Sequence, residues 1–175
     1  MRIIAGSRKG ARIFAPKGLD TRPTADRVRE AAFNLLGPGG AEDAQVLDLF
    51  AGSGAMGLEA MSRGAAHVTF VESDQEACRT INRNLDKLRF DHATVLCQDA
   101  LRALAGERRT YDLVLCDPPY DYDHARLAPH LKRLLTEDGV LVYESAGRED
   151  PPELPGLEVR TSRRYGSARL TLFDT

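Results

Sequence analysis

Residues 48–57 read DLFAGSGAMG and join a short apolar run to the start of a predicted helix. The glycines Gly52, Gly54 and Gly57 form a GxGxxG pattern, which lets backbone amides approach a ligand closely at a helix N-terminus. Glu72 lies 20 residues after Gly52, ends the next apolar run and can bind both hydroxyls of a ribose. These features predict a nucleoside-cofactor site, which fits a nicotinamide dinucleotide and S-adenosylmethionine (SAM) equally well.

From residue 45 onward, short apolar runs alternate with amphipathic stretches of helical spacing. The predicted strands are 46–50, 68–72, 94–98, 111–116 and 140–143, and the predicted helices are 54–63, 75–88, 100–106 and 124–135. Continuous apolar runs indicate strands covered on both faces, and their alternation with helices indicates a parallel, doubly wound sheet. We therefore predict an α/β, Rossmann-like domain over 41–175, closed by an antiparallel hairpin of strands 157–164 and 168–173.

Residues 1–40 differ from this pattern and predict a short N-terminal extension. Runs 2–6 and 11–15 indicate a β-hairpin, and 24–37 indicates a helix that Thr24 can cap. Residues 1–30 hold eight basic and three acidic side chains, a net charge of +5, whereas the remaining 145 residues have a net charge of −7. A basic segment on an acidic body suits contact with nucleic acid, but a solvated charged face explains it equally well.

The overall composition excludes several classes of protein. The 175 residues, 42% of them hydrophobic, suit one globular domain, and a net charge of −2 argues against a general polyanion-coating protein. No apolar run reaches the roughly 18–20 residues that span a membrane, and the charged N-terminus is unlike a signal peptide, so we expect a cytoplasmic protein. Cys78, Cys97 and Cys116 lack CxxC spacing, which predicts free, reduced thiols and no metal site.

Asp48 distinguishes between the two cofactors, because it interrupts an apolar strand four residues before Gly52. A buried carboxylate there needs a cationic partner, and SAM carries an ammonium and a sulfonium group, whereas a dinucleotide would bring a repelling pyrophosphate. A structural carboxylate that binds loop amides remains an alternative. Asp99 follows the third strand and can bind an adenine amino group, cap the next helix, or do both.

The sequence DPPY, residues 117–120, follows the fourth strand at the edge where open α/β sheets bind ligands. The Asp117 side chain and the Pro118 carbonyl can accept the two hydrogens of an exocyclic amine and orient its lone pair for methylation. Tyr120 can stack on a base turned out of its helix. A rigid turn without catalytic function is the alternative for DPPY alone.

Four segments together carry a family resemblance: RPTADRVRE (22–30), DLFAGSGAMGLEA (48–60), VESD (71–74) and DPPY (117–120). The chain resembles the RsmD family of bacterial 16S rRNA guanine-N2 methyltransferases along nearly its whole length. The resemblance implies a seven-stranded class I methyltransferase sheet, SAM as methyl donor, and a guanine of 16S rRNA in a partly assembled small subunit as acceptor. We also expect a monomer.

The resemblance also implies roles for individual residues. Asp117, Pro118 and Tyr120 would be catalytic, and Pro119 would help to form the target-base pocket. SAM would be held by Asp48, Phe50, Gly52, Ser53, Gly54, Glu72, Ser73, Asp99, Ala100 and Asp117. The segment 22–29, with Arg22 and Arg27, would cover the cofactor and contact RNA. The charge of the N-terminal segment, and not the resemblance, leads us to expect RNA contacts from Arg8, Lys9 and Arg12. Tyr165 can contact the substrate or be a structural tyrosine of the closing hairpin.

Three other functions stay open on the residues alone. A nicotinamide oxidoreductase is disfavoured by Asp48 and by DPPY, and an RNA-binding module without activity would not need DPPY. Methylation of adenine is the nearest alternative, because only the resemblance favours guanine.

Overall fold

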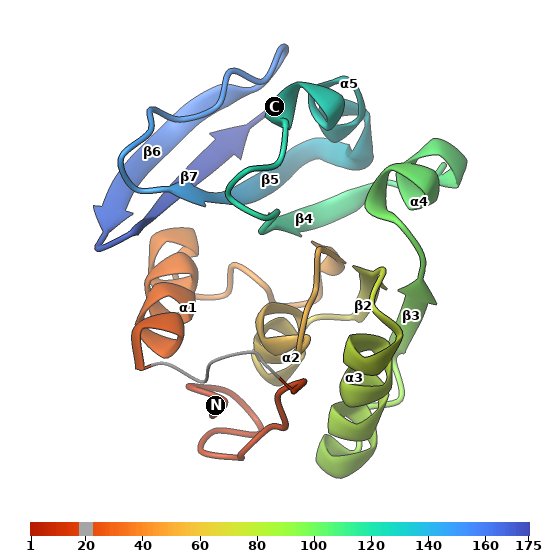
Figure 1. Ribbon diagram of the computed structural model, residues 1–175. Helices are drawn as coiled ribbons and strands as arrows, with labels where there is room; N and C mark the ends of the chain where they lie inside the picture. The colour runs from red at the N-terminus through yellow and green to blue at the C-terminus, as the bar shows by residue number, and fades with distance from the viewer. Residues whose placement is uncertain (18–22) are drawn as a thin grey trace.

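The computed structural model describes residues 1–17 and 23–175, and these ranges contain one sheet of seven strands with helices on both faces (Figure 1). The strand order is β3-β2-β1-β4-β5-β7-β6. The strands are β1 (Gln45–Leu49), β2 (His67–Glu72), β3 (Ala93–Cys97), β4 (Tyr111–Cys116), β5 (Leu135–Ala146), β6 (Glu158–Tyr165) and β7 (Ala168–Asp174).

The first five strands are parallel, and the chain reverses its direction of winding between β1 and β4. The carboxyl ends of β1 and β4 therefore flank the switch point, where open α/β sheets bind ligands. Strand β7 pairs antiparallel with both β5 and β6, which confirms the predicted closing hairpin. The predicted α/β, mostly parallel architecture is correct.

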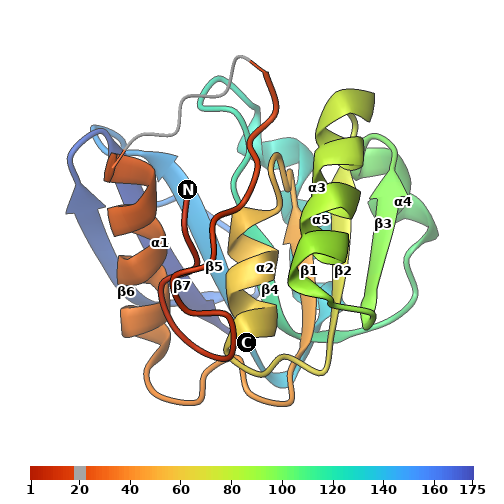
Figure 2. The same cartoon turned by 90° about the horizontal axis from the view of Figure 1, so that it is seen from below.

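Helices cover both faces of the sheet (Figure 2). Helices α1 (Pro23–Leu36), α2 (Ala55–Ser62) and α3 (Gln75–Leu88) lie on one face, and α4 (Ala100–Gly106) and α5 (Ala128–Leu131) lie on the other. Along β1, Val46 packs into the core under α1–α3, whereas Leu47 packs into the core under α4 and α5. Alternate residues thus enter two separate cores, which is why the strands read as continuous apolar runs.

Helix α3 has the bounds that the sequence predicts, and its ends show why. The Asp74 side chain accepts a hydrogen bond from the Ala77 amide at 2.9 Å and caps the first turn. Ala77, Ile81 and Leu85 form a buried stripe at helical spacing.

The prediction of one continuous helix over 124–135 is wrong. The structure divides it into the 3-10 turns His124–Arg126 and Lys132–Leu134, with the four-residue α5 between them. Pro129 lies in the first turn of α5, where its missing N–H is tolerated but an incoming helix cannot continue. Strand β5 begins at Leu135 and runs to Ala146, well beyond the predicted 140–143.

The N-terminal segment forms less regular structure than predicted. Its two arms meet in a single antiparallel bridge, Arg2–Arg12, and no strand is formed within residues 1–17. Ile3 and Ile13 are buried in the same core as α1 and α2, so hydrophobic packing holds the segment in place. Helix α1 begins at Pro23, so Thr24 lies inside its first turn and not before it as expected.

The prediction of three free thiols is also wrong. Cys78 in the first turns of α3 and Cys97 at the end of β3 form a disulfide with a Cα–Cα distance of 6.0 Å. Their separation of 19 residues in the sequence does not indicate a disulfide. The two cysteines come together because the chain returns along β3 after helix α3. Cys116 is a buried free thiol, and burial raises its pKa well above the usual value. Across the described parts of the chain, no helix combines the length and apolar character that a membrane crossing requires.

Candidate active site

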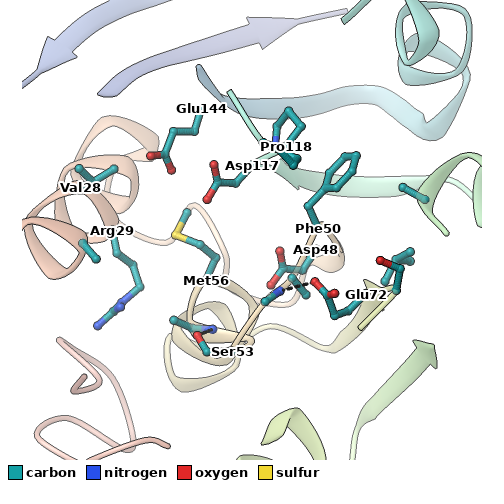
Figure 3. Close-up of a pocket in the computed structure, with 18 of the residues that line it drawn as sticks. Val28, Arg29, Asp48, Phe50, Ser53, Met56, Glu72, Asp117, Pro118 and Glu144 are labelled. Atoms are coloured by element: carbon teal, nitrogen blue, oxygen red, sulfur yellow. Dashed lines mark hydrogen bonds between the residues drawn. The ribbon is translucent and has the colours of Figure 1, made fainter. Parts of the chain in front are cut away.

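A cavity of about 720 Å³ opens at the carboxyl ends of β1 and β4 (Figure 3). Its wall is formed by the loop after β1 with the start of α2, the end of β2, the loops after β3 and β4, one residue of β5 and the turn between β6 and β7. Helix α1 and Met1 contribute from the N-terminal side. The cavity therefore lies at the switch point that the topology defines.

The glycine loop needs its glycines for backbone shape and for packing. Gly52 and Gly54 have φ angles of 56° and 82°, in the left-handed region that favours glycine. A Cβ at Gly57 would lie 2.3 Å from the ring of buried Phe70, so glycine allows α2 to pack on β2. Phe50 shares the left-handed conformation, with φ 59°, and its strained backbone places a phenyl ring on the cavity wall.

Glu72 connects the glycine loop to the end of β2. Its carboxylate accepts hydrogen bonds from the Gly52 amide at 2.9 Å and from the Asp74 amide at 2.8 Å. The side chain still lines the cavity beside Ser73. It can therefore hold the loop in shape and present oxygen atoms to hydroxyl groups of a ligand.

Asp48 is a buried carboxylate without a cationic partner among the described residues. Its side chain is 2% exposed, and the Gly57 amide donates to it at 2.9 Å. Burial is the main cause that raises its pKa to about 8; the Gly57 hydrogen bond acts against this rise, and the nearby carboxylates of Asp117 and Glu72 add to it. Both interpretations of this residue therefore have a structural basis: it binds a loop amide, and its charge lacks a counter-charge that a cationic ligand would supply.

Asp117 and Glu144 form a pair of neighbouring carboxyl groups on the wall of the cavity (Figure 3). The β4–β5 register pairs Cys116 with Tyr143, so the next residue on each strand is one of the two acids. The two carboxyl groups lie close enough that each shifts the pKa of the other, and a proton on one of them would allow a hydrogen bond between them. Burial and the charge of Asp117 raise the pKa of Glu144 to about 9, and burial raises the pKa of Asp117 to about 6, so the proton resides on Glu144 at neutral pH.

The remaining predicted residues divide between the wall and other places. Pro118, Pro119 and Tyr120 line the cavity, and Tyr120 is 44% exposed at its mouth. Asp99 also lines it while its carboxylate caps α4 by accepting from the Arg102 amide at 3.1 Å. Phe50, Ser53, Ser73 and Ala100 are wall residues too. Gly54 is buried behind the loop, and Tyr165 packs against the core under α1.

The basic residues predicted to contact RNA lie away from the cavity. Arg8, Lys9, Arg12 and Arg27 do not line it, and Arg22 lies outside the described residues. Arg29, within the segment expected to touch RNA, is 2% exposed and pairs with buried Glu59 at 3.3 Å. Its guanidinium fixes α1 against α2, and the residue lines the cavity together with Ala25 and Val28 of the same segment.

Sequence reasoning missed several wall residues, of which Glu144, Met56 and Met1 are the most prominent. A signal for Glu144 existed: it follows the apolar run 140–143 at the carboxyl end of the strand beside β4. Met56 and Met1 reach the cavity only through the tertiary fold.

The sheet order, the glycine loop after β1, the acid that ends β2 and the DPPY sequence after β4 define a class I SAM-dependent methyltransferase. A model of the family described as "Conserved hypothetical protein 95" matches residues 1–174, and the chain belongs to this family, the RsmD family. YlbH of Bacillus subtilis (strain 168) is 40% identical over an alignment that spans 99% of this chain and 98% of YlbH. Ribosomal RNA small subunit methyltransferase D of Escherichia coli (strain K12) is 40% identical over 83% of this chain and 71% of its own length. The solved structure of Escherichia coli yhhF superposes with a TM-score of 0.89 at 35% identity, covering 99% of this chain and 96% of that chain.

Proposed function

We propose that this protein transfers a methyl group from SAM to the exocyclic N2 amine of a guanine in 16S rRNA. The observation that carries the proposal is the cavity that holds both Asp48, a buried acid without a cationic partner among the described residues, and the acidic pair Asp117–Glu144 beside Pro118. The small-subunit rRNA methyltransferase among the relatives supports the choice of substrate.

The residues of the cavity fit SAM. When bound, SAM supplies a methyl group on a positively charged sulfur. Asp48 offers the negative charge that its cationic groups require, Glu72 offers oxygens to the ribose, and Asp99 offers an acceptor to the adenine amine. Binding of a cation beside Asp48 would also relieve the unfavourable burial of its charge.

The acidic pair orients and deprotonates the target amine. An aromatic amine is a weak nucleophile, because its lone pair is delocalised into the ring. The Asp117 carboxylate and the Pro118 carbonyl accept its two N–H groups and turn the lone pair toward the methyl carbon. As the N–C bond formed and the bond between the methyl carbon and the sulfur broke, the nitrogen would become positively charged, and its surplus proton would pass to the Asp117 carboxylate. Glu144 would keep its own proton throughout and would donate a hydrogen bond to Asp117, which keeps that side chain oriented.

The same pair favours guanine over adenine. The N2 amine of guanine has the N1–H donor beside it, whereas the N6 amine of adenine has the N1 acceptor beside it. The carboxylate of Asp117 and the carbonyl oxygen of protonated Glu144 offer two adjacent acceptors, which match the guanine pattern. The proposal thus assigns to Glu144 a part of the base selection that the sequence left to family resemblance.

We place this reaction in the cytoplasm, on rRNA within a partly assembled small subunit, and we propose a monomer. The proposal is tested by incubation with labelled SAM and unmodified 16S rRNA, either naked or in small-subunit particles, followed by mapping of the methylated nucleotide.

Asp117→Ala should reduce turnover at saturating SAM by about 100-fold or more while SAM affinity changes little. Asp121→Ala, an exposed acid four residues along the chain that does not line the cavity, is the matched control. Binding of NAD without SAM, or normal turnover of Asp117→Ala, would contradict the proposal.

A further inference from the structure

An exposed aromatic ring with two cations beside it lies on α3, outside the cavity. Phe14 is 37% exposed, one of the few large apolar side chains of the described residues that reach solvent. The guanidinium carbon of Arg83 lies 4.1 Å from its ring centroid, and the Lys87 ammonium nitrogen lies 4.8 Å from it. Both distances are within the range of cation–π attraction.

This cluster is fixed in position by a buried amide. The Asn84 side chain accepts from the Phe14 amide at 2.7 Å and donates to the Phe14 carbonyl at 3.0 Å, as a neighbouring strand would. The same Asn84 amide group donates to the Ser53 carbonyl in the glycine loop at 3.2 Å. The N-terminal segment is thus fastened at Phe14 to α3 and, through one side chain, to the loop of the candidate active site.

The charges on this side of α3 are left uncompensated by close ion pairs. Arg79, Arg83 and Lys87 follow one another at four-residue spacing, an arrangement of like charges that destabilises an isolated helix. Within the described ranges, none of the three has a carboxylate within ion-pair distance, although the exposed acids Glu76 and Asp86 lie on the same helix.

The N-terminal segment adds further positive charge next to this helix. Arg8 donates to the Leu88 carbonyl at 2.7 Å and stacks on Phe90, which fastens the segment to the C-terminal end of α3. Lys9 and Arg12 are exposed on the same segment. Figure 2 shows that the N-terminal segment and α3 lie on the same side of the sheet, so the exposed cations of both belong to one side of the molecule.

We propose that the surface formed by Phe14, Arg83 and Lys87 binds backbone phosphates of the RNA substrate at a distance from the target nucleotide; this rests on the proposed function. The Arg83 and Lys87 side chains lie against the same Phe14 ring, which restricts their motion. They therefore lose less conformational entropy when they bind phosphate oxygens. None of the three residues lines the cavity, so the surface adds affinity and position without entering the chemistry. An anionic backbone fits, because the cluster offers charge and donors but no apolar groove.

The double variant Arg83→Gln/Lys87→Gln tests this surface. Loss of two phosphate contacts should reduce the slope of log affinity against log salt by about 1.4 to 1.8. In methyl-transfer assays KM for RNA should rise while kcat, SAM affinity and Tm stay as in the unaltered protein. Arg102→Gln/Arg108→Gln removes the same charge from exposed positions at the α4 side of the sheet and should leave the slope nearly unchanged.

The outcomes separate the two proposals. An unaltered salt slope in Arg83→Gln/Lys87→Gln, or an equal decrease in the control, overturns the surface even when the enzyme methylates rRNA normally. The RNA-binding surface is also refuted if Arg83→Gln/Lys87→Gln binds RNA normally but no longer binds an acidic protein partner. Absence of methyl transfer by the unaltered protein refutes the proposed function, while a reduced slope in the same protein would still support the RNA-binding surface.

Discussion

Replacement of Glu144 tests whether a proton on this side chain supports the reaction. Glu144→Ala removes the donor that faces Asp117, whereas Glu144→Gln supplies a neutral N–H of similar length in its place. A hydrogen bond to an ionised group contributes about 1.5–3 kcal/mol, so the alanine variant should lose about 10-fold to 150-fold in kcat. The glutamine variant should stay within about threefold of the unaltered enzyme, since its donor is retained.

The pH dependence gives a sharper test than the rate alone. Asp117, with a pKa of about 6, must be ionised to accept the amine hydrogen, and Glu144, with a pKa of about 9, must be protonated to donate. Activity should therefore fall below about pH 6 and above about pH 9, as two apparent pKa values of the pair. At pH 10, one unit above the second value, about a tenth of the enzyme would hold the proton.

The two Glu144 variants should change the pH profile in different ways. The acid limb is the loss of activity below about pH 6, and the alkaline limb is the loss above about pH 9. Glu144→Gln cannot lose a proton, so the alkaline limb should disappear and the acid limb should remain. Glu144→Ala removes the hydrogen bond that lowers the pKa of Asp117, so its acid limb should move to higher pH. The titratable groups of the described residues that interact with this pair are Tyr120, Asp48, Cys116 and Tyr143, and none of them is altered in either variant.

Single-turnover methyl transfer at saturating SAM, from pH 5 to pH 10, measures these profiles. An alkaline limb that persists in Glu144→Gln would assign it to the substrate base or to another residue and refute a donor role for Glu144. A glutamine variant as slow as the alanine variant would refute it as well.

Three further predictions concern stability. Asp48→Asn should reduce a pH dependence of stability. The raised pKa of Asp48 means that the native state binds more protons than the unfolded state between about pH 4 and pH 8, so Tm without cofactor should fall across this window in the unaltered protein. The fall should be smaller in the variant, where the raised pKa values of Asp117 and Glu144 remain, and the variant should bind SAM more weakly. Gly57→Ala should lower the free energy of unfolding in urea by about 1–3 kcal/mol, because its methyl group would collide with a buried ring. Thiol titration of the denatured, unreduced chain should find one free thiol, and Cys78→Ser/Cys97→Ser should lower stability by about 2–4 kcal/mol; three titrated thiols would contradict the disulfide.

The strands and the glycine loop were predictable because their signals are local. Each parallel strand is buried on both faces, so it appears as an apolar run, and GxGxxG marks the turn between β1 and α2. The failure over 124–135 has a physical reason as well. Leucines at helical spacing indicate which face is buried, but Pro129 and two 3-10 turns determine that no long helix forms.

Residues that act in pairs were the ones that the sequence concealed. Asp48 and Asp117 were found because each stands beside a recognisable motif, whereas Glu144 follows an apolar strand without one. Its importance comes from register: β5 lies beside β4, and the residue after Tyr143 must therefore face the residue after Cys116. Without Glu144 beside it, the ionised Asp117 carboxylate at the end of β4 could accept hydrogen bonds but would have no carboxyl group beside it to donate one.

Charge shows the same difference between composition and structure. The net charge of +5 over residues 1–30 suggested an arm that contacts RNA, yet Arg29 is buried and Arg8 fastens the segment to α3. Meanwhile α3, in the acidic remainder of the chain, contributes Arg83 and Lys87 to the same face. The arm therefore matters less as a separate basic tail than as the element that places Phe14 on α3. A variant that keeps every arm charge but replaces Asn84 with Leu should accordingly weaken RNA binding, because it releases Phe14 from the helix.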